Sequence, residues 1–231
     1  MEDISEKDLK ARWDKKKSSF VNFSSKLNKL KRKINSDLKI GDEKEFLSAL
    51  AIMLMIKTAE RVGNNVSAKN GHFGVTGFKK KHIEIFNDGL IYLDYIGKSG
   101  VDHQKIIQDK RLADFLQEAI DYSPNEKVFV TSEGFAIKSD RINRYLNNYG
   151  ISSKDIRGFS ANKYVYDKLK KIKAEDTENK RKTQFNKIAK EVAERVGHGS
   201  ATLQKHYLVP EMKEMFIAGG RIKRLSRKYN L

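Results

Sequence analysis

A short β-rich block lies between two long stretches of helical periodicity, and this order constrains the fold more than any other feature of the chain. The turn signals Asn87-Asp88-Gly89 and Gly97-Lys98-Ser99-Gly100 divide the block into hairpins and place Lys98 at a hairpin tip. Consecutive hairpins predict a small antiparallel three-stranded sheet. The strand-like segments from which we expect it to form are residues 73–78, 82–87, 89–95 and 101–107.

Apolar residues at helical spacing fill the flanking stretches. Phe20, Phe23, Leu27 and Leu30 are spaced by three and four and form one apolar stripe. Residues 43–60 predict an apolar helix, with acidic residues at its start and a C-terminal cap supplied by Gly and Asn in Arg61-Val62-Gly63-Asn64. The other expected helices span about 110–121, 138–148, 156–171, 182–195, 200–206 and 210–228.

These patterns predict an α+β fold that is mainly α. We expect a basic helical arm or connector over residues 1–40 and a helical catalytic domain over residues 41–231. Lys29, Lys31, Arg32 and Lys33 surround the end of the arm's apolar stripe. Two interpretations of this charged run remain open, a solvated helix face and a helix that lies along DNA phosphates.

The net charge of +17, from 47 Lys and Arg against 30 Asp and Glu, predicts a polyanionic partner. Double-stranded DNA fits better than a membrane, because the apolar stretch Phe46 to Ile56 falls short of the ~20 residues of a spanning helix. The N-terminus lacks the apolar run of a secretory signal, and the chain has no cysteine. We expect an intracellular protein that binds no membrane.

Five separated segments carry residues suited to phosphodiester chemistry. Guanidinium groups match the phosphate oxygens, an imidazole adds a hydrogen bond, and a lysine at a hairpin tip can protonate a leaving 5′ oxygen. A tyrosine hydroxyl can attack phosphorus where cationic groups favour its phenolate form. The segments are Arg61-Val62-Gly63-Asn64, Gly97-Lys98-Ser99-Gly100, Lys154-Asp155-Ile156-Arg157, Val196-Gly197-His198-Gly199 and His206-Tyr207.

Over about residues 12–215, the order of these segments resembles the catalytic domain of type IB DNA topoisomerases of the poxvirus and bacterial kind, within the tyrosine recombinase/topoisomerase IB superfamily. The first segment is similar to the family's Arg-x-Gly-Asn, and residues 71–83 resemble its Gly-rich strand and Lys-x-x-His element. Tyr207 follows His198 by nine positions, as we expect for this family.

The resemblance implies roles for individual residues. Tyr207 matches the nucleophile, Arg61 and Arg157 the catalytic arginines, His198 the phosphate-binding histidine and Lys98 the general acid. It also implies relaxation of supercoiled DNA through a 3′-phosphotyrosyl intermediate, without ATP, metal or other cofactor, by a monomer in the cytoplasm, nucleoid or a viral factory. The additional DNA contacts that we expect are Asn64, Lys81, His82 and Lys154.

Full-length relatives also carry an N-terminal β-domain that closes over DNA, and we expect this clamp to be absent here or supplied by a separate domain or partner. The main rival is a tyrosine site-specific recombinase or integrase. Recombinases usually have Arg-x-x-Glu at the first arginine, and this chain has Asn64 in place of the glutamate. They usually have His-x-x-Arg at the second arginine, and this chain has Lys154 in place of the histidine. A non-catalytic DNA-binding module and a metal-dependent nuclease are weaker alternatives, since all five groups are present and no acidic cluster has ligand-like spacing.

Overall fold

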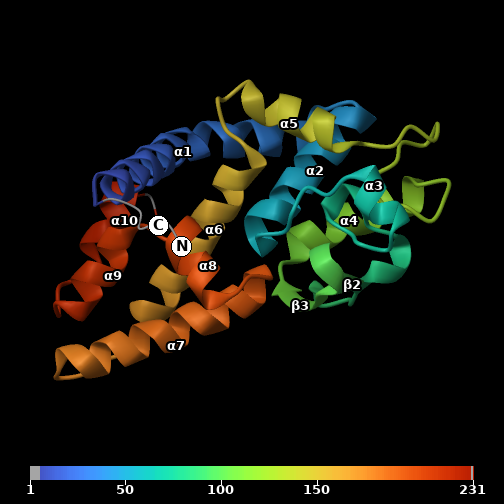
Figure 1. The fold of residues 1–231 in the computed structure, drawn as a ribbon. Coiled ribbons are helices and arrows are strands. Elements are labelled where there is room, and N and C mark those ends of the chain that lie inside the picture. The colour runs from blue at the N-terminus through green and yellow to red at the C-terminus, as the bar shows by residue number, and fades with distance from the viewer. Residues whose placement is uncertain (1–5, 230) are drawn as a thin grey trace. The chain divides into compact units, whose positions relative to one another are not determined.

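The computed structural model describes residues 6–229 and residue 231, which fall into two compact units. Unit 1 combines the first part of the chain, up to Leu27, with Gly158–Leu231, and unit 2 is Asn28–Arg157. Figure 1 shows the elements of both. Helix α1 (Glu6–Ile40) and helix α6 (Ser153–Leu169) each contribute residues to both units.

Unit 2 is built around α2 (Glu43–Thr58), in which ten of sixteen residues are buried. Asp42 caps the helix by accepting a hydrogen bond from the Glu45 amide at 2.8 Å, as its acidic start predicts. Residues buried on all sides mark a central helix. It packs against α4 (Lys110–Tyr122), α5 (Ser139–Asn147) and the sheet.

The sheet of unit 2 is antiparallel and has the order β1 (Ile83–Ile85), β2 (Leu90–Ile96), β3 (Asp102–Gln108). This confirms the predicted small three-stranded sheet. Gly89, at φ +84°, closes the first turn, and the 3₁₀ turn Lys98–Gly100 joins β2 to β3. In the β2–β3 register, Leu93 lies opposite Lys105 and Tyr95 opposite His103.

Residues 73–78 were expected to be a strand and are not one. They contain a 3₁₀ turn over Val75–Gly77, preceded by a short helix α3 (Asn65–Lys69). The backbone amides of Val75 and Thr76 donate to the carbonyls of Arg61 and Val62, both at 2.9 Å. The segment therefore pairs with the residues after α2 instead of extending the sheet.

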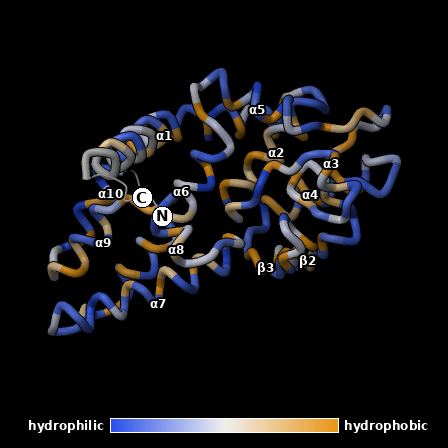
Figure 2. The backbone as a smooth tube through the Cα atoms, in the orientation of Figure 1, coloured by the Kyte–Doolittle hydropathy of each residue, from blue (hydrophilic) through white to orange (hydrophobic). Residues whose placement is uncertain are grey.

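In unit 1, α6 is followed by α7 (Glu178–Val196), α8 (Ser200–His206), α9 (Pro210–Ile217) and α10 (Arg224–Tyr229). The single helix expected over 210–228 is wrong, because the chain leaves the helical path at Gly219, where φ is +74°. Figure 2 shows hydrophilic and hydrophobic residues alternating along α7, as expected for a helix with one buried face.

The aromatic core of unit 1 draws on both ends of the chain. The Phe20 ring stacks on Phe159 at 5.7 Å between centroids and meets Tyr229 edge-on at 5.2 Å. All four residues of the apolar stripe expected in the arm are buried, from Phe20 to Leu30. The stripe therefore packs in the core, as its spacing predicts. Among the described residues, none of the helices is both long and apolar enough to cross a membrane.

Candidate active site

The segment after α2 is held in a sharply defined path. Ala59 ends the helix in the left-handed region, with φ +59°, four residues before the glycine that was expected to cap it. Gly63 then takes φ +85° and lies against Gly74, where an added Cβ would come within 2.6 Å of the Gly63 Cα. Two backbones can approach this closely only where neither residue has a side chain.

Arg157 is bound to this same turn. Its Nε donates to the Ala59 carbonyl at 2.9 Å, and its side chain is only 7% exposed. Arg61 follows Ala59 by two residues, so one turn carries one predicted arginine and anchors the other. A fixed guanidinium loses little freedom when it binds a phosphate, which favours anion recognition at this turn.

A buried ion pair lies beneath the turn. The Glu60 carboxylate contacts the Lys105 ammonium of β3, and both side chains are almost fully buried. Lys105 also donates to the Thr58 carbonyl at 3.2 Å. The pair therefore ties the segment that carries Arg61 to the strand that follows the Lys98 turn.

Lys98 is exposed in the turn between β2 and β3. Beside it, the rings of Tyr95 and His103 stack, with centroids 5.0 Å apart and planes within 9°. Burial and the charge of Glu60 raise the pKa of Tyr95. Burial is the main cause of the lowered pKa of His103. The positive charges of Lys105, Arg157 and Arg61 lower this pKa further.

Unit 1 brings the other two predicted catalytic residues together. Gly197 ends α7 in the left-handed conformation, with φ +68°, and the His198 amide donates to the Ala193 carbonyl at 2.8 Å. This cap turns the chain so that the rings of His198 and Tyr207 lie 4.7 Å apart between centroids. Tyr207 itself ends α8 and is half-buried.

Asn162, on α6, fixes the backbone around Tyr207. Its side-chain amide donates to the Tyr207 carbonyl at 2.8 Å, and its side-chain oxygen accepts from the Val209 amide at 2.9 Å. The side chain also donates to the Gly158 carbonyl at 2.7 Å and is fully buried. A buried carboxamide with all these bonds made is a rigid support.

The four predicted DNA contacts differ in placement. Lys81 and Lys154 are exposed, and Lys154 lies in the first turn of α6. Asn64 is exposed, and its side-chain oxygen accepts from the Ser67 amide at 2.8 Å to cap α3. His82 is only 6% exposed and its ring lies 4.3 Å from that of Phe73. A contact between His82 and DNA would therefore require the imidazole to leave this position.

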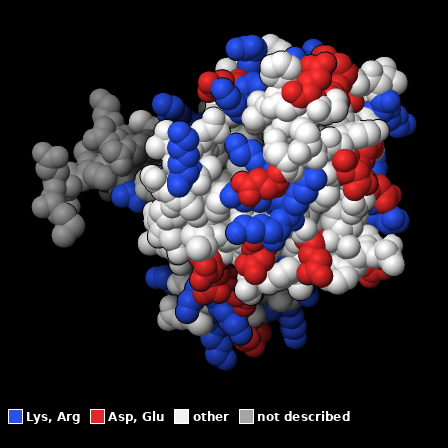
Figure 3. Space-filling view, turned by 90° about the vertical axis from the view of Figure 1, so that its right-hand side faces the viewer, with Lys and Arg blue, Asp and Glu red and all other residues white. Residues whose placement is uncertain are grey.

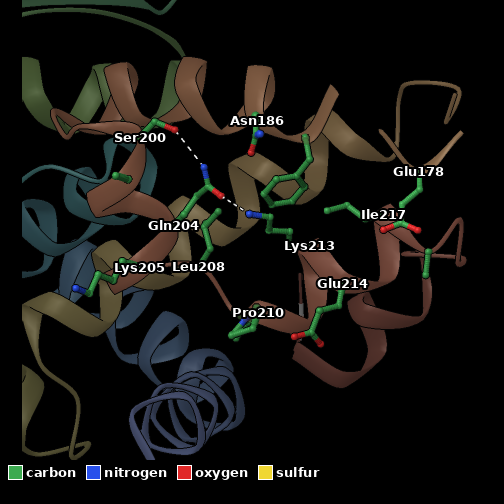
Figure 4. Close-up of a pocket in the computed structure, with 14 residues that line it drawn as sticks. Glu178, Asn186, Ser200, Gln204, Lys205, Leu208, Pro210, Lys213, Glu214 and Ile217 are labelled. Atoms are coloured by element: carbon green, nitrogen blue, oxygen red, sulfur yellow. Dashed lines mark hydrogen bonds between the residues drawn. The ribbon is translucent and has the colours of Figure 1, made fainter. Parts of the chain in front are cut away.

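A groove of about 1120 Å³ opens in unit 1 between α7, α8 and α9 (Figure 4). Gln204 crosses it, with hydrogen bonds to Ser200 at 3.3 Å and to Lys213 at 2.9 Å. None of the five predicted catalytic residues lines this groove. Among the described residues there is also no group of three or more His, Asp or Glu side chains that could hold a metal ion.

Positive and negative side chains are mixed on one face of the protein (Figure 3). On the face drawn in Figure 3, Lys and Arg side chains lie among Asp and Glu side chains. The formal charge of +17 therefore does not produce a field of one sign over that face.

The sequence matches the family of the eukaryotic DNA topoisomerase I catalytic core over residues 6–228. The chain belongs to this family. The match to the topoisomerase I core family includes all five residues predicted to be catalytic, from Arg61 to Tyr207. No similar sequence was found among curated proteins.

Solved structures similar to this topoisomerase I core include two of the XerH site-specific recombinase, both 17% identical in sequence. One is a pre-cleavage complex with difH substrate, with a TM-score of 0.52 over 81% of this chain and 51% of the recombinase. The other is a post-cleavage complex with palindromic difH, with a TM-score of 0.53 over 80% and 49%. The chain thus spans about half the length of the recombinase chains, and the likeness shows a shared fold.

Four residues that support the core's predicted site were not predicted from the sequence: Glu60, His103, Lys105 and Asn162. Lys105 was detectable, since strand alternation puts it on the same face as the buried Ile107. A charged residue on the inward face of a strand needs a buried partner. Asn162 gave no such signal, because it lies among polar and apolar residues of an ordinary helix.

Proposed function

We propose that the protein relaxes supercoiled DNA as a type IB topoisomerase, with Tyr207 as the nucleophile. In this proposal, Arg61, Arg157 and His198 bind the oxygens of one backbone phosphate. Hydrogen-bond donors that are fixed where negative charge develops contribute roughly 2.7–4 kcal/mol each to transition-state stabilisation. Cationic neighbours also favour the phenolate form of the attacking tyrosine.

The cleavage step exchanges one phosphodiester for another. A bond forms between the Tyr207 oxygen and phosphorus, and the bond from phosphorus to the 5′ oxygen breaks. The phenolic proton is released to solvent, and Lys98 delivers a proton to the 5′ oxygen. The free end rotates and its 5′ hydroxyl then attacks the 3′-phosphotyrosyl bond, so that strand closure requires neither ATP nor metal.

The match to the topoisomerase I core over residues 6–228 carries this proposal. Two features of the individual units support it. In unit 2, Arg157 is hydrogen-bonded to the turn that leads into Arg61. In unit 1, the capped end of α7 holds His198 against the ring of Tyr207. Each arrangement prepares groups for the phosphate before DNA binds.

Site-specific recombination is the second candidate, since XerH recombinase has a similar fold. Recombination would use the same five groups in the same cleavage step. Asn64 favours the topoisomerase because it completes the family's Arg-x-Gly-Asn. Lys154 also differs from the histidine that recombinases usually have at the corresponding position. A plasmid with two target sites separates the candidates, because a recombinase deletes or inverts the intervening DNA and a topoisomerase only relaxes it.

The test is relaxation of negatively supercoiled plasmid in EDTA without ATP, with Tyr207→Phe as the matched variant. We expect the wild-type protein to produce a ladder of relaxed topoisomers and the variant to produce none. Relaxation by both proteins would reject Tyr207 as nucleophile. Absence of wild-type activity until a divalent metal is added would reject the metal-free mechanism.

A further inference from the structure

The ring of His103 lies against Gly97, in the turn that carries Lys98. Tyr95 and His103 face each other across β2 and β3, two residues before and two residues after the 97–101 turn. Their rings stack with centroids 5.0 Å apart and an interplanar angle of 9°. Such offset pairs of aromatic rings contribute roughly 0.5–1.5 kcal/mol beyond the area that they bury.

The imidazole also occupies the space where a side chain at residue 97 would be. A Cβ added to Gly97 would come within 2.5 Å of the His103 Cδ2 and 2.6 Å of its Nε2. The φ of Gly97 is −89°, a value open to any residue, so its backbone conformation does not require glycine. The ring of His103, in the position that it occupies, does require glycine at residue 97, because a Cβ there would overlap the ring.

The middle of strand β3 is fixed to the turn that carries Arg61. Lys105 follows His103 by two residues, on the same face of β3, and makes the buried ion pair with Glu60. Glu60 immediately precedes Arg61. The strand that holds His103 is therefore anchored at its middle residue, and the exposed Lys98 turn lies just before its first residue.

We propose that His103 is a positioning residue, whose ring holds Gly97 and thereby directs Lys98 toward the leaving 5′ oxygen. The inference rests on the proposed function, in which Lys98 is the general acid. The imidazole acts through its shape, packed between Tyr95 and Gly97. Burial lowers its pKa, which keeps the stacked ring uncharged near neutral pH. His103 thus positions Gly97, and Gly97 in turn positions Lys98.

The test compares two DNA substrates with the same cleavage site, one with the natural 5′ oxygen and one with sulfur in its place. A thiolate leaves without a proton, so the sulfur substrate does not need a general acid. We expect His103→Ala to slow single-turnover cleavage of the oxygen substrate at least about tenfold, part of the roughly 10²–10⁴-fold that a general acid contributes, and to leave the sulfur substrate almost unaffected. Gly97→Ala should have the same effect, because its methyl group displaces the ring.

Two variants sharpen the comparison. His103→Phe keeps a flat ring at the position and should restore most of the lost rate. Gln104→Ala removes an exposed neighbour on the opposite face of β3 and should cleave both substrates as the wild-type protein does. Equal slowing of both substrates by His103→Ala, or failure of His103→Phe to recover, would overturn the positioning role.

Hydrogen exchange at the turn separates this inference from the proposed function. The Gly97 amide donates to the Val101 carbonyl at 2.7 Å, and His103→Ala should accelerate its exchange while His103→Phe should not. Unchanged exchange in His103→Ala would reject the positioning role, whatever the activity. If exchange changes as expected but the wild-type protein forms no covalent adduct with either substrate, the proposed function fails and the packing of the turn by His103 stands.

Discussion

The side chain of Asn162 holds the backbone on both sides of Leu208, the residue that follows Tyr207. It donates to the Tyr207 carbonyl at 2.8 Å and accepts from the Val209 amide at 2.9 Å. Tyr207 lies at the end of a helix of only seven residues, α8, which gives the phenol little support of its own. The orientation of the proposed nucleophile therefore depends on a residue 45 positions earlier in the chain.

Replacing Asn162 tests this dependence. We expect Asn162→Ala to reduce the rate of covalent adduct formation at least about tenfold, since small displacements of a reacting group are costly. The loss of partners for buried backbone groups should also cost about 1–3 kcal/mol in the free energy of unfolding. Asn186→Ala is the control, because Asn186 is exposed on α7. An adduct rate for Asn162→Ala equal to that of the control would contradict the account.

The buried pair Glu60–Lys105 predicts a non-additive effect on stability. Glu60→Gln or Lys105→Met alone leaves one charge buried without its partner, which should cost about 3–5 kcal/mol in the free energy of unfolding. The double variant removes both charges and should recover much of that loss. Urea denaturation of the four proteins measures the coupling. If the stability loss of the double variant equals the sum of the two single losses, the two charges do not stabilise each other.

Two histidines of unit 2, the buried His82 and the half-buried His103, predict how stability changes with pH. Burial is the main cause that lowers the pKa values of His82 and His103 from 6.5. In the window below 6.5 and above the folded-state values, the unfolded chain binds protons that the folded chain does not. The stabilisation is therefore present above pH 6.5 and is lost as the pH falls below it.

Denaturation at pH 7.5 and pH 5.5 measures this loss, with His103→Phe expected to lose less stability than the wild-type protein over the same interval. His206→Gln is the control, because His206 is exposed on α8. A wild-type protein that is equally stable at both values, or more stable at pH 5.5, would contradict the burial of these rings.

Lys154 predicts a salt-sensitive contact with DNA. A lysine in the first turn of a helix is unfavourable next to the positive end of the helix dipole, and a bound phosphate would offset this cost. We expect Lys154→Ala to weaken DNA binding and to reduce the slope of log K against log salt by about 1. Lys173→Ala, in the exposed segment before α7, should leave the slope unchanged. Equal slopes for all three proteins would exclude Lys154 from phosphate binding.

Local sequence patterns predicted most of the helices and the Lys98 hairpin, because apolar periodicity and turn residues act over short distances. The failures arose where distant segments decide the structure. Residues 73–78 include the strand-forming residues Phe, Val and Thr, but the Gly74–Gly63 approach draws them into a turn against the segment after α2. Helix α2 ends at Ala59, where tertiary contacts hold a non-glycine residue in the left-handed region.

The same distinction applies to the site. Motif order predicts Arg61, Lys98, Arg157, His198 and Tyr207 as the reacting groups, since a resemblance preserves the order of residues along the chain. The residues that support them depend on tertiary contacts, as Glu60 meets Lys105 only when β3 packs beneath the turn after α2. A sequence pattern can nominate a reacting group, whereas the residues that orient it emerge only from packing.

The central claim is that residue 207 becomes covalently joined to DNA. The most direct measurement incubates the protein with a labelled duplex that is nicked just beyond the cleavage site, so that the short fragment with the new 5′ hydroxyl diffuses away. The trapped adduct is then mapped by mass spectrometry. We predict one 3′-phosphotyrosyl bond at Tyr207, and no adduct from Tyr207→Phe although that variant still binds the duplex. An adduct on another residue, or a 5′-linked adduct, would contradict the account.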